Sequence, residues 1–314
     1  MGRFDHLATT PARGPGDILR WKLLDRIAGR LRKDPGGFVT PTREHDRALV
    51  ATGEPSLTWI GHASFLVCLG GVRILVDPIF AERLGPVRRL APVGIPVADL
   101  PAIDLVLLTH NHRDHLDAGS IARIGAGPRY VAPLGNGKLL RDAGARDVVE
   151  LDWWDTVTHG SLEITLVPAR HWSMRFPWDR NEALWGGYVI RGPEGAAYHS
   201  GDTAFFDGFA EIPRRAGPID WAMLPIGAYE PRWFMSPQHM CPEEAVEAAR
   251  LLEARTMVAM HWGTFKLTDE PVCEPPERAR AAWRERGADE RSLWILDVGE
   301  TRALTAAAPG TRSI

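Results

Sequence analysis

The stretch LTHNHRDHLD, residues 108–117, is unusually rich in side chains that can bind a metal ion. Its three histidines and two aspartates follow the apolar run LVLL, residues 105–108. A continuous apolar run of this kind is typical of a buried strand. Side chains just beyond the carboxyl end of such a strand project into the crevice where α/β proteins hold their ligands. Imidazole and carboxylate groups suit zinc, and to a lesser degree manganese or iron. The stretch therefore predicts a metal site.

The spacing within this stretch favours two neighbouring ions over one. His110 and His112 are two residues apart, so they can converge on one ion while the chain stays extended. Asp114 and His115 follow where the chain turns, so they point elsewhere. Three later strand ends offer further ligands of the same kind: His171 in VPARHW, Asp202 in YHSGDT and His261 in VAMHWG.

The rest of the sequence predicts short strands and helices that alternate in both halves of the chain. This order favours one α/β domain with sheets inside and helices outside, over residues 51–314. Residues 292–304, SLWILDVGETRAL, are expected to form a closing pair of strands. Residues 1–50 are predicted to be an N-terminal extension, rich in proline, glycine and charge.

One basic amphipathic helix is expected inside the extension, over Gly16–Lys33. Asp17 is expected to cap it, and Leu24, Ile27 and Leu31 fall on one face. Such a helix can lie on anionic lipid. The alternative is a helix that packs on the domain and keeps a solvated basic rim.

Composition excludes several classes of protein. The 314 residues carry a net charge of −3, so the chain has no overall positive charge that would attract nucleic acid. The three cysteines lie far apart without a CxxC pair, which favours a reducing compartment. No signal peptide or membrane-spanning run is visible. A cytoplasmic protein is expected, with peripheral contact to the inner face of the membrane as an option. A homodimer stays open.

The pattern HxHxDH with the later His, Asp and His resembles the metallo-β-lactamase superfamily. That resemblance implies a four-layer αββα sandwich with a dinuclear site at one edge of its sheets. Over about Ser56–Thr268 the sequence is similar to the N-acyl-phosphatidylethanolamine-hydrolysing phospholipase D family. The segments that carry this similarity are WIGHASFLV (59–67), DPIF (77–80), LWGGYVI (184–190), LPIGAYEPRWFMSPQHMCPEEAV (224–246) and HWGTF (261–265).

The resemblance also implies which residues hold the metal. His110, His112 and His171 would hold one zinc ion, and Asp114, His115 and His261 would hold a second. Asp202 would bridge the two ions. Two zinc ions per chain are expected, with Mn²⁺ or Fe²⁺ as alternatives. A pair of such cations lowers the pKa of a shared water and stabilises the charge that develops on a phosphodiester. Asp114 is therefore expected to be catalytic as well as a ligand.

Further roles follow from the same resemblance. His239 is expected near the leaving-group oxygen, against the alternative of a purely structural role. The residues expected to bind substrate are Arg175, Tyr229, Glu230, Arg232, Trp233 and Gln238. Arg232 could pair with a phosphate or with Glu230. His62 could support a metal ligand or be a core histidine. Asp117 could support a ligand or cap a helix. The residues between Arg175 and Leu184 depart from the family pattern, which leaves acyl-chain and head-group preference open.

The function expected from these features is a zinc-dependent phosphodiesterase of the phospholipase D type. Its phospholipid substrate would be N-acyl-phosphatidylethanolamine, and its products N-acylethanolamine and phosphatidic acid. The alternative is a lactonase or amide hydrolase of the same fold, against which the stretch GAYEPRWFM (227–235) weighs. A nuclease and a non-catalytic metal scaffold are further options. The absence of a basic aromatic stretch disfavours the nuclease, and the complete ligand set disfavours the scaffold.

Overall fold

The computed structural model describes residues 2–29 and 34–305 and contains two seven-stranded sheets. The first sheet has the strand order β16-β1-β2-β3-β6-β7-β8. Its strands are β1 (Ser56–Gly61), β2 (Ser64–Leu69), β3 (Val72–Val76), β6 (Leu105–Leu107), β7 (Arg129–Pro133), β8 (Asp147–Leu151) and β16 (Thr301–Ala303). Strands β1, β2, β3 and β16 pair antiparallel, whereas β3, β6, β7 and β8 pair parallel. The parallel half brings the carboxyl ends of its strands to one edge.

The second sheet has the strand order β15-β14-β13-β12-β11-β10-β9. Its strands are β9 (Thr156–His159), β10 (Leu162–Val167), β11 (Gly187–Gly192), β12 (Gly195–His199), β13 (Trp221–Pro225), β14 (Thr256–Met260) and β15 (Leu293–Trp294). Strands β9 to β12 form an antiparallel meander, and β12 to β15 are parallel. The two sheets therefore share one plan, with an antiparallel half and a parallel half.

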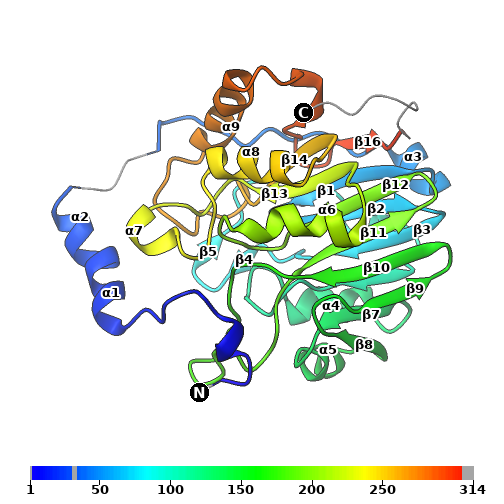
Figure 1. Ribbon diagram of the computed structural model, residues 1–314, viewed down its shortest axis with the longest axis horizontal. Helices are drawn as coiled ribbons and strands as arrows, with labels where there is room; N and C mark the ends of the chain where they lie inside the picture. The colour runs from blue at the N-terminus through cyan, green and yellow to red at the C-terminus, as the bar shows by residue number, and fades with distance from the viewer. Residues whose placement is uncertain (1, 30–33, 306–314) are drawn as a thin grey trace.

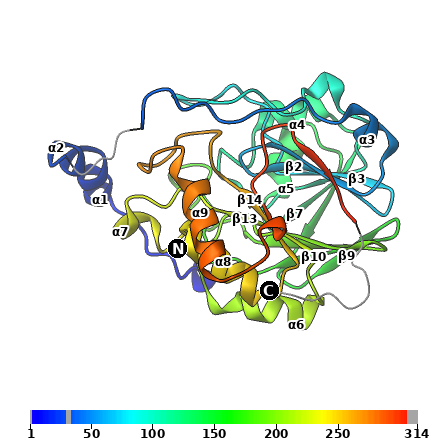
Figure 2. The same ribbon diagram turned by 90° about the horizontal axis from the view of Figure 1, so that it is seen from above.

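Helices cover the outer faces of both sheets, so that the molecule has four layers. Figures 1 and 2 show α6, α8 and α9 on the side of the second sheet and α4 beside the first. The helices of the body are α3 (Arg47–Thr52), α4 (Ala118–Ile124), α5 (Gly137–Asp142), α6 (Glu211–Ala216), α7 (Arg232–Met235), α8 (Pro242–Leu251) and α9 (Glu274–Glu285). A small hairpin, β4 (Arg83–Leu84) with β5 (Val87–Arg88), lies apart from both sheets. The αββα sandwich expected from the sequence is confirmed.

Two apolar clusters hold the layers together. The larger contains buried side chains from both sheets, such as Trp59 and Phe65 from the first and Ile164 and Tyr188 from the second. It continues past the second sheet to α8 and α9. The smaller cluster packs the other face of the first sheet against Ile121 of α4 and Leu140 of α5. Both faces of the central strands are thus buried, and every residue of β1, β2 and β13 is buried without alternation along the strand.

The buried strand expected at residues 105–108 is present as β6, but the expected closing strand pair is wrong. Within residues 292–304, β15 pairs with β14 of the second sheet, whereas β16 pairs with β1 of the first. The chain between them crosses from one sheet to the other. Both strands are very short, so their residue pattern shows that they are extended without showing which neighbour supplies the hydrogen bonds.

The N-terminal segment forms a short helix that stands out from the body beside α7 (Figures 1 and 2). It runs through α1 (Pro15–Leu19), a π-helical turn at Arg20–Leu24, and α2 (Asp25–Ile27). The expected helix Gly16–Lys33 extends to residues 30–33, Leu31 included, which lie outside the described residues. The N-cap residue of α1 is Gly14 and not the expected Asp17. The carboxylate of Asp17 accepts a hydrogen bond from the backbone N–H of Gly14.

Two further expectations concern this region. The boundary between an extension, 1–50, and a domain, 51–314, falls inside α3 and stays a prediction. Among the described residues, no helix is both long enough and apolar enough to span a membrane.

Candidate metal centre

Four loops at one edge of the two sheets supply the predicted ligands. The loop after β6 in the first sheet provides His110, His112, Asp114 and His115. In the second sheet, His171, Asp202 and His261 follow β10, β12 and β14. The structure brings all seven side chains together in two adjoining groups.

The first group contains His110, His112, His171 and Asp202, whose ligand atoms all lie within 4.8 Å of one another. The Nδ1 atom of His112 lies 2.9 Å from Nε2 of His110 and 3.2 Å from Nε2 of His171. The Oδ2 atom of Asp202 lies 3.9 Å from each of these two Nε2 atoms. Three imidazole nitrogens and one carboxylate oxygen thus converge on one point, a donor set that suits zinc.

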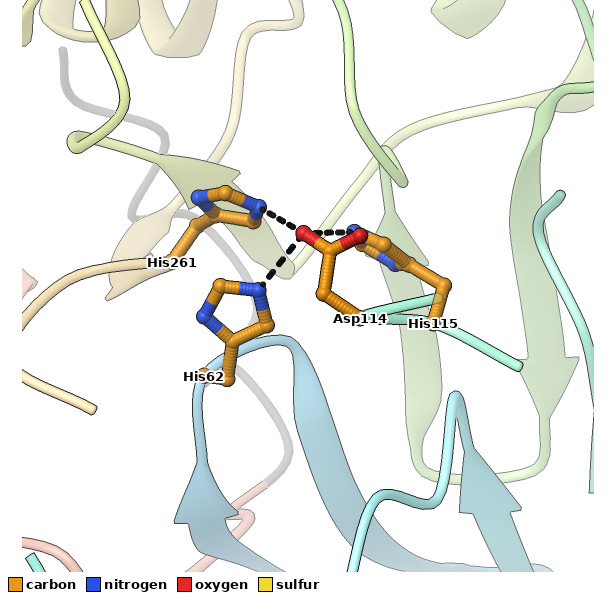
Figure 3. Close-up of side chains that lie close together, drawn as sticks. All are labelled: His62, Asp114, His115 and His261. Atoms are coloured by element: carbon orange, nitrogen blue, oxygen red, sulfur yellow. Dashed lines mark hydrogen bonds and ion pairs between the residues drawn. The ribbon is translucent and has the colours of Figure 1, made fainter. Parts of the chain in front are cut away.

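The second group contains Asp114, His115 and His261, with His62 beside them (Figure 3). The Oδ2 atom of Asp114 lies 3.8 Å from Nε2 of His115 and 3.5 Å from Nε2 of His261. Asp202 reaches this group too, since its Oδ2 lies 3.2 Å from His115 and its Oδ1 lies 3.1 Å from His261. Asp202 is therefore the carboxylate that faces both groups.

The electrostatics of the site fit bound cations. Asp77, Asp202 and His115 are nearly or fully buried, and Nε2 of His115 and Nε2 of His261 have no hydrogen-bond partner among the described residues. Burial opposes the protonated form of His261, yet Asp202 and Asp114 raise its pKa to about 9. Buried carboxylates thus demand positive charge at this point, since unpaired buried charge is costly. By contrast, burial lowers the pKa of His112 to about 3, which leaves a neutral ring able to act as a ligand.

The loop geometry around the site is strained. His62, Asp77 and His261 have φ angles of 57°, 42° and 62°, in the left-handed region that non-glycine residues seldom adopt. Such strain costs about 1–3 kcal/mol per residue and gathers at functional sites. Gly227 contributes by its small size, because a Cβ atom there would lie 2.1 Å from the carbonyl oxygen of His261. A larger residue at position 227 would displace the His261 loop.

Sequence reasoning missed Asp77, which orients His115. Its Oδ2 atom lies 2.7 Å from Nδ1 of His115 and accepts a hydrogen bond from the Thr109 hydroxyl. Its Oδ1 atom accepts from the Thr109 backbone N–H. A carboxylate behind a ligand histidine fixes the ring so that Nε2 faces the metal. The signal available in the sequence was an aspartate directly after the apolar strand that neighbours β6.

His62 and Asp117, each predicted with an alternative, occupy different places. The Nε2 atom of His62 lies 3.1 Å from Oδ2 of Asp114, and its ring centroid lies 3.9 Å from that of His261 (Figure 3). Burial lowers the pKa of His62 to about 3, so the ring is neutral. Asp117 is the N-cap of α4, where its carboxylate accepts hydrogen bonds from Ser120 N–H and Oγ–H. His62 thus contacts a predicted ligand directly, whereas the contacts of Asp117 are those of a cap.

A mainly apolar cavity of ≈380 Å³ opens above the two groups. Trp21, Trp172, Met174, Phe234, Met235 and Leu267 supply its apolar wall. His239, Gln238, Arg113 and Arg175 also line it. Trp21 comes from the N-terminal helix and packs on Phe234, with ring centroids 4.7 Å apart. That the N-terminal segment forms a wall of this cavity could not be predicted from its residue pattern.

His239 lies at the floor of the cavity with its ring almost fully buried. Its Nε2 atom lies 3.9 Å from Oδ2 of Asp202, and its Nδ1 atom has no hydrogen-bond partner among the described residues. The guanidinium of Arg232 donates to the His239 carbonyl oxygen and pairs with Glu244 at 2.9 Å. Arg232 therefore holds the segment between α7 and α8 that presents His239.

Four residues expected to bind substrate are not among those that line this cavity, and their role in binding stays a prediction. The Tyr229 hydroxyl donates to Glu274, and its ring is fully buried. Glu230 accepts from the backbone N–H of Arg232, whose guanidinium is engaged with Glu244 rather than with Glu230. The Trp233 indole donates to Asp25. Of the predicted substrate-binding residues, Gln238 and Arg175 are the two that reach the cavity.

The chain is similar in sequence to a known protein family and to several known proteins. The family described as "Beta-lactamase superfamily domain" matches residues 72–262. N-acyl-phosphatidylethanolamine-hydrolyzing phospholipase D 1 of Caenorhabditis elegans is 38% identical over 264 residues, which cover 77% of this chain and 74% of that protein. A UPF0173 metal-dependent hydrolase of Methanopyrus kandleri is 35% identical over 249 residues, 78% of this chain and 98% of its own.

A solved structure with a similar fold is that of Igni18, a metallo hydrolase from the archaeon Ignicoccus hospitalis. It superposes with a TM-score of 0.60 and 26% identity, covering 79% of this chain and 97% of that one. The resemblance expected from the sequence is thereby confirmed. With its two adjoining clusters of histidine and aspartate, the chain belongs to the β-lactamase superfamily, as a metal-dependent hydrolase.

Proposed function

We propose that the protein is a zinc-dependent phospholipase D that hydrolyses N-acyl-phosphatidylethanolamine to N-acylethanolamine and phosphatidic acid. The observation that carries this proposal is the position of the apolar cavity directly above the paired ligand groups. A lipid phosphodiester needs both features at once, since its hydrocarbon must leave water while its phosphate meets cations. The name of the Caenorhabditis relative supports the same substrate.

Zinc-class ions held by the two groups would lower the pKa of water and offset the negative charge that develops on the phosphoryl oxygens. The residues of the chain do the rest. Asp77 holds His115 in one orientation, and His62 contacts Asp114, so the donor atoms are arranged before substrate arrives. Trp21 and Phe234 keep water away from one side of the cavity, which strengthens the electrostatic interactions inside it.

His239 is assigned to the leaving group. During hydrolysis the water oxygen bonds to phosphorus, the bond from phosphorus to the ethanolamine oxygen breaks, and that oxygen takes up a proton. An imidazole N–H beside the departing oxygen can donate this proton or a hydrogen bond. His239 qualifies because its ring faces the cavity beside Asp202 and its Nδ1 atom has no other partner among the described residues.

The proposal includes contact with an anionic membrane surface through the N-terminal helix. Ile18, Leu19, Leu23, Leu24 and Ile27 are each between 46% and 74% exposed, which is unusual for large apolar side chains. On the same helix, Trp21 lines the cavity. Helices with an outward apolar face and basic flanks lie in the membrane interface, and this placement would bring the lipid head group to the cavity.

The decisive experiment is hydrolysis of N-acyl-phosphatidylethanolamine vesicles in ¹⁸O-labelled water, with products identified by mass spectrometry. Attack at phosphorus places one ¹⁸O atom in phosphatidic acid and none in the N-acylethanolamine. A lactonase or amide hydrolase would instead label a carboxylic acid. A panel with a lactone and an RNA substrate completes the comparison. Label in a fatty acid, or turnover of the lactone alone, would overturn the proposal.

A further inference from the structure

Arg113 is a cation that belongs to neither ligand group of the metal centre. It stands between the predicted ligands His112 and Asp114, lines the cavity and is exposed. Among residues 2–29 and 34–305 its guanidinium has no hydrogen-bond or ion-pair partner. A guanidinium without a partner repels divalent cations bound beside it. Its position there is favourable when it binds an anion other than the metal ligands.

Arg175 lines the same cavity from another loop. Its Nη1 atom donates to the carbonyl oxygen of Leu116 at 2.6 Å, which anchors the half-buried guanidinium. Arg113 is close enough that, after burial, its charge contributes to lowering the pKa of Arg175. Two guanidiniums from separate loops therefore face one part of the cavity rim.

The charges of Asp117, Asp179 and Asp114 act on Arg175 and raise its pKa against burial, but none of these carboxylates forms an ion pair with either guanidinium. Asp117 is occupied with Ser120 at the start of α4, and Asp179 accepts from the backbone N–H groups of Arg175 and Phe176. Asp114 contacts His62 within the second ligand group. In the part of the chain that the structure describes, no carboxylate forms an ion pair with either guanidinium.

We propose that Arg113 and Arg175 form a second anion site that binds a carboxylate on the head group of the lipid. This inference rests on the proposed function, because the phosphodiester occupies the metal groups and the second anion must belong to the same molecule. The planar guanidinium matches a carboxylate in geometry and stays charged at every relevant pH. The preferred substrate class is then an N-acylated phospholipid whose amino alcohol bears a carboxylate, as a serine head group does.

The test uses two soluble probes that differ by a single carboxylate, N-acetyl-O-phosphoserine and N-acetyl-O-phosphoethanolamine. Calorimetry with the zinc-loaded full chain gives a dissociation constant for each. We expect the carboxylate-bearing probe to bind about tenfold more tightly, the lower end for a hydrogen bond to a charged group, because the rim is open to solvent. The preference should fall with added salt.

Substitutions of the two arginines test whether they cause the tighter binding of the carboxylate-bearing probe. Arg113→Gln should reduce the ratio of the two constants several-fold, and Arg113→Gln combined with Arg175→Gln should bring it to about one. Arg214→Gln is the matched control, since it removes the same charge from α6 at a residue outside the cavity lining. A wild-type ratio of one, or a ratio that survives the double substitution, overturns the second anion site.

Lipid turnover separates this inference from the proposed function. Vesicles that contain N-acylated phosphatidylserine should be hydrolysed faster than vesicles with N-acylated phosphatidylethanolamine, and Arg113→Gln should narrow the difference. If neither lipid is hydrolysed while the probe preference persists, the proposed function fails and the anion site stands. If both lipids are hydrolysed equally and the probe ratio is one, the anion site fails and the proposed function stands.

Discussion

At the scale of single residues, the carboxylate of Asp202 is the point where the two ligand groups meet. Its Oδ2 atom lies near His110, His115 and His171, and its Oδ1 atom lies 3.1 Å from His261. A side chain in that position would be shared by two bound ions, so its loss would affect both ligand groups rather than one.

Substitution Asp202→Asn should therefore remove most bound metal and nearly all hydrolytic activity, while the fold is retained. Elemental analysis of purified protein should find about two zinc-class ions per wild-type chain and well under one in the variant. Asp207→Asn, an exposed carboxylate five positions on, is the control and should keep both ions. A single ion in fully active wild-type protein would contradict the dinuclear assignment.

Substitution His239→Ala should leave the metal content intact but slow hydrolysis of a lipid phosphodiester. A positioned proton donor contributes about 10²–10⁴-fold. A nitrophenyl phosphodiester has a leaving group that needs little protonation, so the defect should shrink sharply with that substrate. The measurement is kcat for both substrates in wild type and variant. Equal losses on both would assign His239 to lipid positioning or to the fold.

The sequence predicted the ligands far better than the residues around them. All seven ligand side chains were recognisable because each follows a strand end, and the structure brings them together. Asp77 escaped because a lone aspartate after a strand has no distinctive spacing. The contacts of Tyr229, Arg232 and Trp233 with Glu274, Glu244 and Asp25 could not be predicted, because a residue pattern does not show which side chains of distant elements lie nearby.

At the scale of elements, apolar runs located the buried strands, whereas pairing partners were not visible. β1, β2 and β3 follow one another in the sequence and are adjacent in the sheet. β15 and β16 were expected to pair with each other and instead join different sheets. Local turn residues specify a hairpin, but the partner of a two- or three-residue strand depends on the finished tertiary structure.

The N-terminal helix should bind anionic vesicles through its outward apolar face. Replacing Leu19, Leu23 and Leu24 by Gln should reduce vesicle binding in a sedimentation assay and spare turnover of a soluble phosphodiester. The physical reason is loss of apolar burial, added to a contribution of about 1 kcal/mol from each basic residue near the surface. The control places Gln at Val39 and Leu90, which are exposed elsewhere. Unchanged binding would show that another surface is the anchor.

The same helix should also shape the cavity, because Trp21 is one of its walls. Trp21→Ala should raise KM for a long-chain lipid by about tenfold, since burial of an aromatic side chain is worth about 1.5–3 kcal/mol. Hydrolysis of a small nitrophenyl phosphodiester should change little. Thr52→Ala, at an exposed helix position away from the cavity, is a control. If both substrates lost the same factor, Trp21 would act on the fold and not on the acyl group.

At the scale of the whole molecule, the metal centre joins the two sheets. His110, His112, Asp114 and His115 follow a strand of the first sheet, whereas His171, Asp202 and His261 follow strands of the second. Ions bound between them would connect the layers at one edge in addition to the apolar core.

Metal removal should therefore lower the thermal midpoint. A ligand that binds only the folded state stabilises it by about 2.7 kcal/mol at a hundredfold excess over its Kd. Scanning calorimetry of wild type with zinc and with a chelator should show this difference as a clear fall in Tm. Asp202→Asn should have a low Tm that no longer responds to zinc. Equal Tm values for zinc-loaded and chelator-treated wild type would contradict structural coupling by the ions.

Because the chain crosses from β15 to β16 near its end, the first sheet can be completed only late in translation. β1 is made early, yet its partner β16 is the last strand of the described chain. Until β16 appears on the ribosome, one edge of the first sheet exposes unpaired N–H and C=O groups, which are a template for aggregation. Residues 41–43 precede β1 in the sequence, but their backbone hydrogen bonds go to Val298, which is itself made late. Nascent chains that stall before residue 300 should therefore depend on chaperones to stay in solution.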